Sequence, residues 1–386
     1  MPGFDVAIVG LGAMGAAAAY QLAKRGVRVI GFDRHHPPHT LGSSHGETRV
    51  TRLAIGEGDH LTPLVMRSHE LWREIERETG ASLLSEVGGL IVSSHSNAAV
   101  THVAGFFQKT VAAAERFGIA HELLTAANIR ARWPQLKVRD DEFGYFEPSA
   151  GFVRPEECVR AQLALAQKNG AEVRANETVL GFEPAPDCVR ITSDKGTYSA
   201  GKLIVAAGPW LPQLLGDHYM HLFKIYRQVQ FWFELHDIAP FRPERFPIFI
   251  WELQNSKQGL YGFPAIDGVR AIKVASEQFE STTTPDTVNR EVSTEEIAAM
   301  RALIAPHLEG VGPHCVKATT CLYTVTPDFG FVIDTHPESK RVILASPCSG
   351  HGFKHSPAIG EALADLALGQ PPRFDLAPFR LSSRAW

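Results

Sequence analysis

The sequence has few cysteines, no excess of basic residues and no long apolar run. Its five cysteines show no CxxC spacing, which indicates reduced thiols rather than a disulfide framework. Lysine and arginine number 38 against 42 acidic residues, for a net charge of −4. This balance gives no general reason to bind nucleic acid or an anionic membrane. No run approaches the roughly 18 apolar residues of a spanning helix, and the first residues lack a signal-peptide pattern. We therefore expect a cytoplasmic protein without nucleic-acid or membrane partners.

The N-terminal segment carries the clearest pattern in the chain. Residues 5–9 (DVAIV) form a short, β-branched apolar run, which predicts a buried parallel strand. The segment 10–15 (GLGAMG) follows, and helix-forming residues then continue to a stop at Gly26. A second apolar run, 27–32, ends at Asp33. The pattern is that of one complete βαβ unit.

The glycines of this unit point to a bound dinucleotide. Gly10, Gly12 and Gly15 permit a tight turn and let a pyrophosphate approach the helix N-terminus, where free amides favour anions. Asp33 closes the second strand at the expected interval and can accept hydrogen bonds from an adenosine ribose. A chance glycine turn is the weaker interpretation in this context. The motif alone does not separate FAD from NAD.

The rest of the chain predicts a doubly wound α/β domain with a second domain inserted into it. The 386 residues suffice for two structural domains. Alternating residues around 229–234 predict an antiparallel sheet, whereas the apolar run 342–345 and the helix pattern after it return to α/β character. The expected first domain comprises 1–85, 146–215 and 315–386, and the expected second domain comprises 86–145 and 216–314. Helices are expected at 62–79, 155–168, 293–305 and 356–368.

A loop rich in histidine follows Asp33. It contains His35, His36 and His39 around the pair Pro37-Pro38. Clustered histidines can indicate a metal site, but no thiol or carboxylate stands among them at a recognised ligand spacing. We expect no metal, and a polar loop packed against a cofactor instead.

Several segments in chain order carry a family resemblance. They are PPHT at 37–40, GSSHGETR at 42–49, Arg52, GEG at 56–58, GFP at 262–264, Cys321 with Tyr323, TPD at 326–328, VID at 332–334, SGHGFK at 349–354 and FDLAPFRLS at 374–382. On these segments the chain resembles the monomeric sarcosine oxidase and N-methyltryptophan oxidase family of covalent FAD amine oxidases. The resemblance covers essentially the whole chain.

The resemblance implies a covalently held FAD in a Rossmann-like domain, with the inserted antiparallel-sheet domain binding substrate. Cys321 is then the residue whose sulfur joins the 8α-methyl carbon of the flavin, and a positive neighbourhood helps because the thiolate is the nucleophile. Without its flanking match, an isolated cysteine would be interpreted as a small core residue. The residues implied to bind the cofactor are Gly10, Gly12, Gly15, Asp33, Arg34, Ser43, Val179, Gly350, Gly352 and Phe353.

The resemblance also assigns the residues that act on substrate and oxygen. Arg52 and Lys354 would bind a substrate carboxylate, which favours an amino acid over a plain amine. Lys273, in the strand-like segment 271–274, would stand above the flavin and promote the reduction of oxygen. Arg49, against the flavin ring, and His45 are the further catalytic residues that the resemblance implies. Tyr261 and Glu277 are assigned to the substrate pocket. Tyr261 alone could equally be an ordinary sheet aromatic.

The sequence departs from the family pattern at three positions. Glu277 stands where the family usually has an active-site histidine, four residues after Lys273. Ser44 replaces the first residue of a His-His pair, and Glu47 replaces the usual aspartate. A carboxylate at position 277 either favours a more cationic substrate or turns away from the pocket.

The expected activity is oxidation of a secondary (N-methyl) α-amino acid, such as sarcosine or N-methyltryptophan. The products would be an imine, which water hydrolyses, and hydrogen peroxide from molecular oxygen. One alternative is an oxidase of cyclic imino acids similar to pipecolate or proline, or a flavin dehydrogenase. A weaker alternative is a flavin-binding subunit without catalysis. We expect a monomer whose partners are a small amino acid and oxygen.

Overall fold

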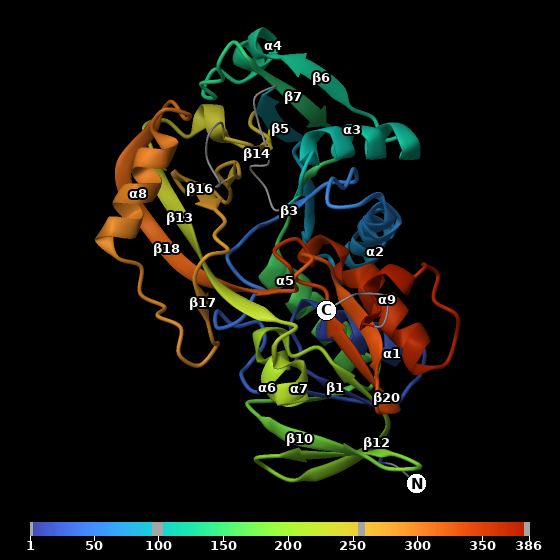
Figure 1. Cartoon of the computed structure of the whole chain (residues 1–386). Coiled ribbons are helices and arrows are strands. Elements are labelled where there is room, and N and C mark those ends of the chain that lie inside the picture. Colours follow the sequence, from blue (N-terminus) through green and yellow to red (C-terminus); the bar gives the residue numbers. More distant parts are fainter. Residues whose placement is uncertain (1–2, 95–102, 254–258, 382–386) are drawn as a thin grey trace.

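The computed structural model describes residues 3–94, 103–253 and 259–381. Two large sheets form the framework, and helices pack around and between them (Figure 1). The blue N-terminal segment and the red C-terminal segment lie together in one half of the molecule (Figure 1). That half is therefore built from both ends of the chain, as the sequence predicts. None of the described helices is long and apolar enough to cross a membrane.

The first sheet has a parallel core in the order β9-β2-β1-β12-β20. Its strands are β1 (Phe4–Val9), β2 (Val29–Asp33), β9 (Glu172–Ala175), β12 (Thr197–Val205) and β20 (Ser339–Ser346). Three antiparallel strands extend it: β10 (Val179–Pro184), β11 (Val189–Ser193) and β19 (Val332–His336). Only the second half of β12 pairs within the parallel part of the sheet, because its first half pairs with the antiparallel strand β11.

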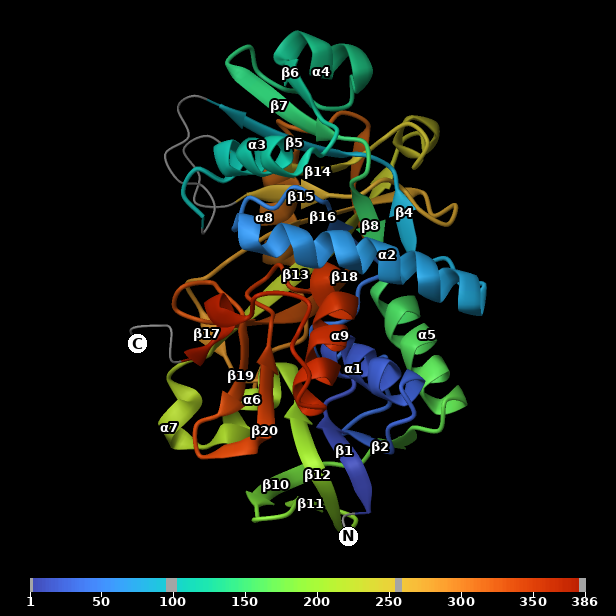
Figure 2. The same cartoon turned by 90° about the vertical axis from the view of Figure 1, so that its right-hand side faces the viewer.

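Helices cover one face of the parallel sheet. They are α1 (Ala13–Lys24), α5 (Pro155–Lys168) and α9 (Ser356–Ala367), with α2 (Thr62–Thr79) crossing above them (Figure 2). A Cβ at Gly360 of α9 would lie 2.4 Å from the Cβ of Ala17 in α1. Small residues thus let these two helices approach closely. The observed bounds of α2 and α5 equal the predicted ones, and α2 ends at Gly80 in a left-handed conformation.

The second sheet has the order β17-β13-β16-β15-β14-β5-β7-β6, and β18 pairs with the other edge of β13. Its strands are β5 (Gly89–Ser94), β6 (Glu122–Thr125), β7 (Glu142–Glu147), β13 (Lys224–Leu235), β14 (Ile248–Trp251), β15 (Leu260–Gly262), β16 (Ala271–Ser276), β17 (Thr282–Thr283) and β18 (Val311–Val325). The sheet is antiparallel except for one pair, β5 and β14, which run parallel. The antiparallel prediction holds apart from this pair, whose strands come from distant parts of the chain.

Strand β13 shows why the alternating pattern is only partly visible in burial. Phe231 and Phe233 pack in a core with residues of α8 (Thr294–Ile304), as the period of two predicts. Gln230 and Trp232 on the opposite face are also buried. Trp232 stands opposite Lys273 of β16 in the strand register. The second face of this strand is therefore buried against the candidate site.

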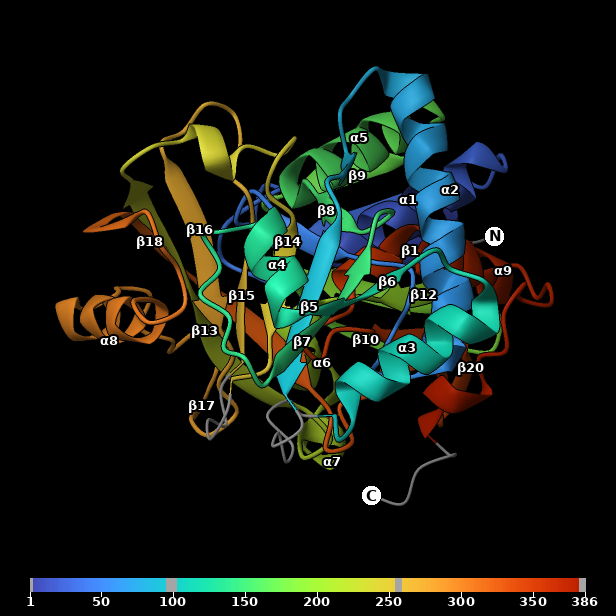
Figure 3. The same cartoon turned by 90° about the horizontal axis from the view of Figure 1, so that it is seen from above.

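A three-stranded sheet and several short helices complete the described parts of the chain. The small sheet has the order β3-β8-β4, from β3 (Arg49–Thr51), β8 (Gly151–Val153) and β4 (Leu84–Glu86). The remaining α-helices are α3 (Phe106–Phe117), α4 (Ala126–Arg132), α6 (Leu211–Leu215) and α7 (Asp217–Met220). Seen from above, α3 and α4 lie on the side of β5, β7 and β14 (Figure 3).

The division into two domains stays a proposal, and strand pairing suggests a change at two of its boundaries. The boundary at 145/146 falls within β7, and the boundary at 314/315 falls within β18. Each of these strands pairs within the second sheet along its length. We propose that both strands belong wholly to the inserted domain.

Candidate functional site

The turn between β1 and α1 can be made only with glycine. Gly10 has a φ of +90°, and a Cβ there would lie 2.5 Å from the carbonyl oxygen of Ala206. A Cβ at Gly15 would lie 1.8 Å from the carbonyl oxygen of Gly10. These contacts hold the N-terminus of α1 close to the sheet, where its free amides can face an anion. The motif has the geometry that the sequence predicts.

The Asp33 carboxylate is fixed at the end of β2. Its Oδ2 accepts a hydrogen bond from the backbone N–H of Leu11 at 2.9 Å, and its Oδ1 accepts one from the N–H of His35 at 2.9 Å. The Nε2 of His39 lies 3.5 Å from the same Oδ1. Each carboxylate oxygen has more than one acceptor direction. The group can therefore bind a ribose hydroxyl without losing these contacts.

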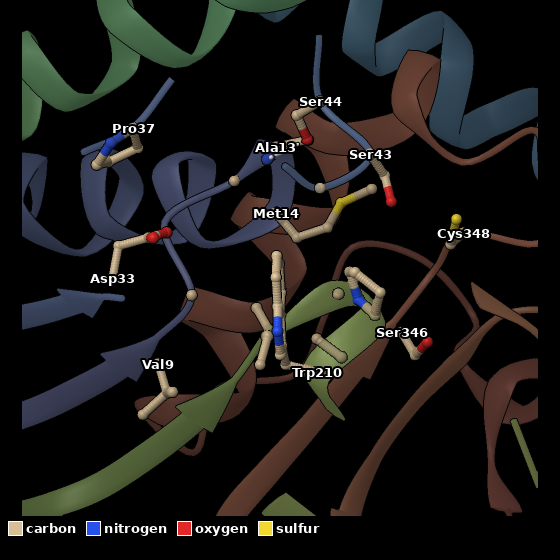
Figure 4. A pocket seen from close by; sticks show the side chains of 18 of the residues that line it. Val9, Ala13, Met14, Asp33, Pro37, Ser43, Ser44, Trp210, Ser346 and Cys348 are labelled. Atoms are coloured by element: carbon tan, nitrogen blue, oxygen red, sulfur yellow. Dashed lines mark hydrogen bonds between the residues drawn. The ribbon is translucent and has the colours of Figure 1, made fainter. Parts of the chain in front are cut away.

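A cavity of about 380 Å³ runs from Asp33 past the glycine turn. Asp33 and Pro37 stand at one end and Ser43 and Cys348 at the other, with Trp210 between them (Figure 4). The predicted cofactor residues that line it are Gly10, Gly12, Asp33, Arg34, Ser43, Val179, Gly350, Gly352 and Phe353. Gly15 lies beneath the turn and outside the lining. An elongated cavity beside a glycine cradle fits a dinucleotide such as FAD.

Arg49 and Cys321 meet beside this cavity. The Nη2 of Arg49 donates to the carbonyl oxygen of Ser43 at 3.0 Å and lies 3.3 Å from the Sγ of Cys321. Cys321 is fully buried on β18 and belongs to the lining of neither cavity described here. The Ser43 hydroxyl donates to the carbonyl oxygen of Leu322 at 2.5 Å, which fixes the loop against β18. A guanidinium at this distance stabilises a thiolate.

A second cavity of about 140 Å³ adjoins the first. The two share Arg49, Tyr323, Gly350 and Phe353 as lining residues. The predicted residues that line the second cavity are Arg49, Arg52, Tyr261, Lys273, Glu277 and Lys354. The structure thus brings together side chains from β3, β15, β16 and the segment before α9.

Two buried cations of this cavity face one carboxylate. The Nη2 of Arg52 lies 2.6 Å from Oε2 of Glu57, and the Nζ of Lys354 lies 3.8 Å from Oε1. Burial raises the pKa of Glu57, but Arg52 and Lys354 outweigh it and hold that pKa well below its usual value. Burial lowers the pKa of Lys354 to about 8, against the opposing effect of Glu57. The Nε of Arg52 is buried without a hydrogen-bond partner in the described part of the chain, so a donor remains for a ligand.

Glu57 lines the second cavity and is absent from the site residues that the sequence predicts. It appears in the matching GEG segment, but nothing in the sequence connects it with Lys354, which lies far along the chain. A Cβ added at the neighbouring Gly56 would lie 2.5 Å from Oγ1 of Thr110. This close approach fixes the path of the loop that carries Glu57. The GEG match was the available signal, since two glycines around one acid indicate a constrained loop.

Lys273 is buried on β16 with three oxygen acceptors. Its Nζ donates to the carbonyl oxygens of Gly46 at 2.6 Å and Thr48 at 2.8 Å, and to Oγ1 of Thr48 at 3.2 Å. Burial and then the neighbouring Arg49 lower the pKa of this amine well below its usual value. Three acceptors match the three hydrogens of an ammonium group. The three acceptors thus favour the ammonium form of Lys273, whereas burial and Arg49 favour the neutral amine.

His45 lies behind the site and lines neither cavity. Burial, then Arg49 and Lys273, lower the pKa of its imidazole to about 3. The ring is therefore neutral at physiological pH. Its Nε2 is buried without a hydrogen-bond partner among the residues described. A catalytic role for His45 remains a prediction.

Glu277 does not turn away from the second cavity but forms part of its wall. A Cβ at Gly350 would lie 3.3 Å from Oε1 of Glu277 and 2.9 Å from the Tyr323 ring. Burial and then the charge of Glu277 raise the pKa of Tyr261, which also hydrogen-bonds with Tyr323. The glycine at position 350, with a φ of +84°, leaves the room that these side chains occupy.

Comparison with known proteins places this geometry in a family. A family model described as "DAO: FAD dependent oxidoreductase" matches residues 5–366. The monomeric sarcosine oxidase of Streptomyces avermitilis is 42% identical over 370 residues, which cover 95% of this chain and 94% of that protein. The N-methyl-L-tryptophan oxidase of Salmonella heidelberg is 33% identical over 385 residues and 98% of both chains.

Solved structures agree with this relationship. NikD, described as an unusual amino acid oxidase essential for nikkomycin biosynthesis, superposes with a TM-score of 0.85 at 25% identity, covering 98% of this chain and 97% of that one. Glycine oxidase from Geobacillus kaustophilus has a TM-score of 0.79 at 21% identity, covers 99% of both chains, and shares the fold. A glycine cradle, an elongated cavity and full-length relatives agree: the chain belongs to the DAO family of FAD-dependent oxidoreductases and, within it, to the group of monomeric sarcosine oxidases and N-methyltryptophan oxidases.

Proposed function

We propose that this protein is an FAD-dependent oxidase of a secondary, N-methyl α-amino acid, acting with oxygen as the electron acceptor. The observation that carries the proposal is the junction of two cavities at Arg49, Tyr323, Gly350 and Phe353. One cavity has a dinucleotide turn and the other has buried cations. A flavin ring at the junction would meet an anionic substrate from the second cavity. FAD, when bound, would accept two electrons as the CH–NH group of the substrate is oxidised to an imine, and would pass them to oxygen.

The residues of the second cavity bind and orient the substrate in this proposal. Arg52 offers its unpartnered Nε and Lys354 its ammonium to the substrate carboxylate. The cationic surroundings lower the pKa of the bound amine, so that it reacts as the neutral form. Buried rings such as Phe263 exclude water from the reacting carbon. Water hydrolyses the imine product after oxidation.

Lys273 and Arg49 supply positive charge where oxygen is reduced. Lys273 is held in place by the hydrogen bonds that its Nζ donates to Gly46 and Thr48. A fixed cation stabilises the negative charge that develops on oxygen, and it needs no reorganisation at that moment. Its lowered pKa makes proton transfer from Nζ easier. This role remains part of the proposal.

Cys321 is proposed to hold FAD through a thioether to the 8α-methyl carbon. The Arg49 guanidinium supports the assignment because its Nη2 lies 3.3 Å from the sulfur and places positive charge beside it. Such a bond would remove one hydrogen from the thiol and one from the methyl group, and oxygen would take up both as hydrogen peroxide. Acid-precipitated protein should stay yellow, whereas Cys321→Ser should release its flavin. Cys188→Ser, at a half-buried cysteine outside the lining of both cavities, is the control. Release of flavin from the wild type would contradict the linkage.

A panel of N-methyl and cyclic amino acids, assayed for peroxide, tests the proposed activity. The purified protein should be yellow, and an N-methyl amino acid should bleach it under anaerobic conditions and produce peroxide in air. Bleaching without peroxide would indicate a dehydrogenase, and no bleaching by any member would refute the oxidase. We further propose a monomer, which the relative named a monomeric sarcosine oxidase supports, and a location in the cytoplasm.

A further inference from the structure

Glu277 follows directly after β16, which ends at Ser276, and its side chain lines the substrate cavity. Side chains alternate along a strand, so residues 273 and 275 share one face of β16, and residue 277 comes next in that alternation just past the strand end. Lys273 and Glu277 both line the cavity, while Ala275 between them is small and buried. At about 3.3 Å per residue of extended chain, the Cα atoms of positions 273 and 277 are roughly 13 Å apart. The carboxylate therefore stands well along the cavity wall from Lys273.

Three aromatic residues line the cavity together with this carboxylate. Tyr261, Phe279 and Tyr323 line the same cavity as Glu277. The rings of Phe279 and Tyr323 have centroids 6.5 Å apart at an angle of 35°. The charge of Glu277 acts on both tyrosines and on Lys354. A carboxylate among aromatic faces is a favourable environment for an organic cation, because both attract positive charge.

The charges of the cavity suit a substrate with two opposite groups. Arg52 and Lys354 with Glu57 form a cluster with one net positive charge, which a substrate carboxylate neutralises. Arg49 and Lys273 line the same cavity in addition to this cluster. An amino acid whose amine is neutral brings only that one negative charge. Glu277 repels such a substrate, whereas it attracts one that also bears a positive side chain. The cavity thus has an anion clamp and a separate wall that favours a cation.

We propose that the preferred substrate is an N-methyl α-amino acid whose side chain ends in an ammonium or guanidinium group, and that Glu277 and the rings of Tyr261, Phe279 and Tyr323 bind that cation. The inference rests on the proposed oxidase function and names its substrate class. Glu277 is then the residue that determines specificity.

Binding can be measured without turnover. Omega-amino carboxylates such as 5-aminopentanoate and 6-aminohexanoate are compared with pentanoate and hexanoate, which lack the cation, through the change in flavin absorbance. The wild type should bind the amino form at least about tenfold more tightly, the ratio expected from one favourable ion pair of about 1.4 kcal/mol. Glu277→Gln should bring that ratio close to one. Glu280→Gln, at an exposed acid three residues away, is the matched control and should keep the wild-type ratio.

Turnover gives the second measurement. The kcat/KM values for the Nα-methyl derivatives of ornithine, lysine and arginine are compared with those for N-methyl-norvaline and N-methyl-norleucine. The cationic substrates should be preferred by the wild type by at least about tenfold, and Glu277→Lys should reverse the preference towards N-methyl-glutamate. Equal values for cationic and alkyl compounds, or a preference that persists in Glu277→Gln, would overturn the inference. Cation-selective binding without oxidation of any N-methyl amino acid would refute the oxidase function and leave the cation subsite standing.

Discussion

Replacement of Glu57 by glutamine should have opposite effects on folding and on ligand binding. Glu57 is the internal counter-ion of Arg52 and Lys354, at 2.6 Å and 3.8 Å. Removal of one partner from a buried charge pair typically costs about 3–5 kcal/mol, since the remaining charges stay uncompensated. The free energy of unfolding of Glu57→Gln should therefore fall by about this amount. A ligand carboxylate should restore much of it.

The same change should strengthen the binding of a simple carboxylate. In the wild type, propionate must share two cations with Glu57, and for two carboxylates about 6 Å apart at an effective dielectric constant of about 20 the repulsion is about 3 kcal/mol. Loss of Glu57 also lowers the pKa of Lys354 further, because Glu57 works to raise that pKa. Binding then has to recover a proton, which offsets part of the gain. We expect affinity to rise by roughly tenfold near pH 6.5.

Titration of flavin absorbance with propionate, together with thermal unfolding with and without propionate, measures both effects. Glu57→Asp keeps the charge and is the control: it should change affinity much less than Glu57→Gln. If Glu57→Gln binds propionate more weakly while Glu57→Asp resembles the wild type, Glu57 orients the clamp and does not compete with the ligand. That result would refute the reasoning from charge.

Three further predictions concern the clamp, the oxygen site and the glycine turn. Affinity for propionate should fall as the pH rises through about 8, because Lys354 then loses its proton, and Lys354→Gln should flatten this limb of the titration. Lys273→Met should slow reoxidation of reduced flavin by about 10²–10³-fold, measured by stopped flow, with a far smaller effect on anaerobic reduction; equal effects would contradict its role. Gly15→Ala should yield protein that retains no FAD, because the new Cβ would lie 1.8 Å from a carbonyl oxygen; a yellow variant with the wild-type flavin content would be the contrary result.

The sequence predicts most reliably what is encoded over short distances. The strand, glycine turn and helix of 5–26 are neighbours in the chain, so their periodicity and stop signals define the unit. Helix bounds at 62–79 are correct for the same reason, since proline and glycine mark both ends. The family resemblance, and no local pattern, assigns Arg52, Lys273 and Lys354 to the site. Spacing alone leaves them as surface charges.

Long-range contacts explain what the sequence does not reveal. The ion pair of Glu57 with Lys354 joins segments almost three hundred residues apart, and no local pattern encodes such a partner. The parallel pairing of β5 with β14 also depends on a distant return of the chain. Burial of Trp232 on the polar face of β13 follows from its packing beside Lys273. Period-two alternation predicts exposure there.

Cys321 lies on β18 of one sheet, whereas the glycine turn that faces the pyrophosphate belongs to the other. The first cavity likewise has walls from both, with Val9 and Phe32 on one side and Tyr323 on the other. A dinucleotide in this cavity would contact residues of both sheets. It would therefore bind only while both halves of the molecule are folded. The binding free energy of the dinucleotide would then add to the stability of both halves. The two halves should therefore unfold together in the flavoprotein, and this coupling should be absent from the flavin-free chain.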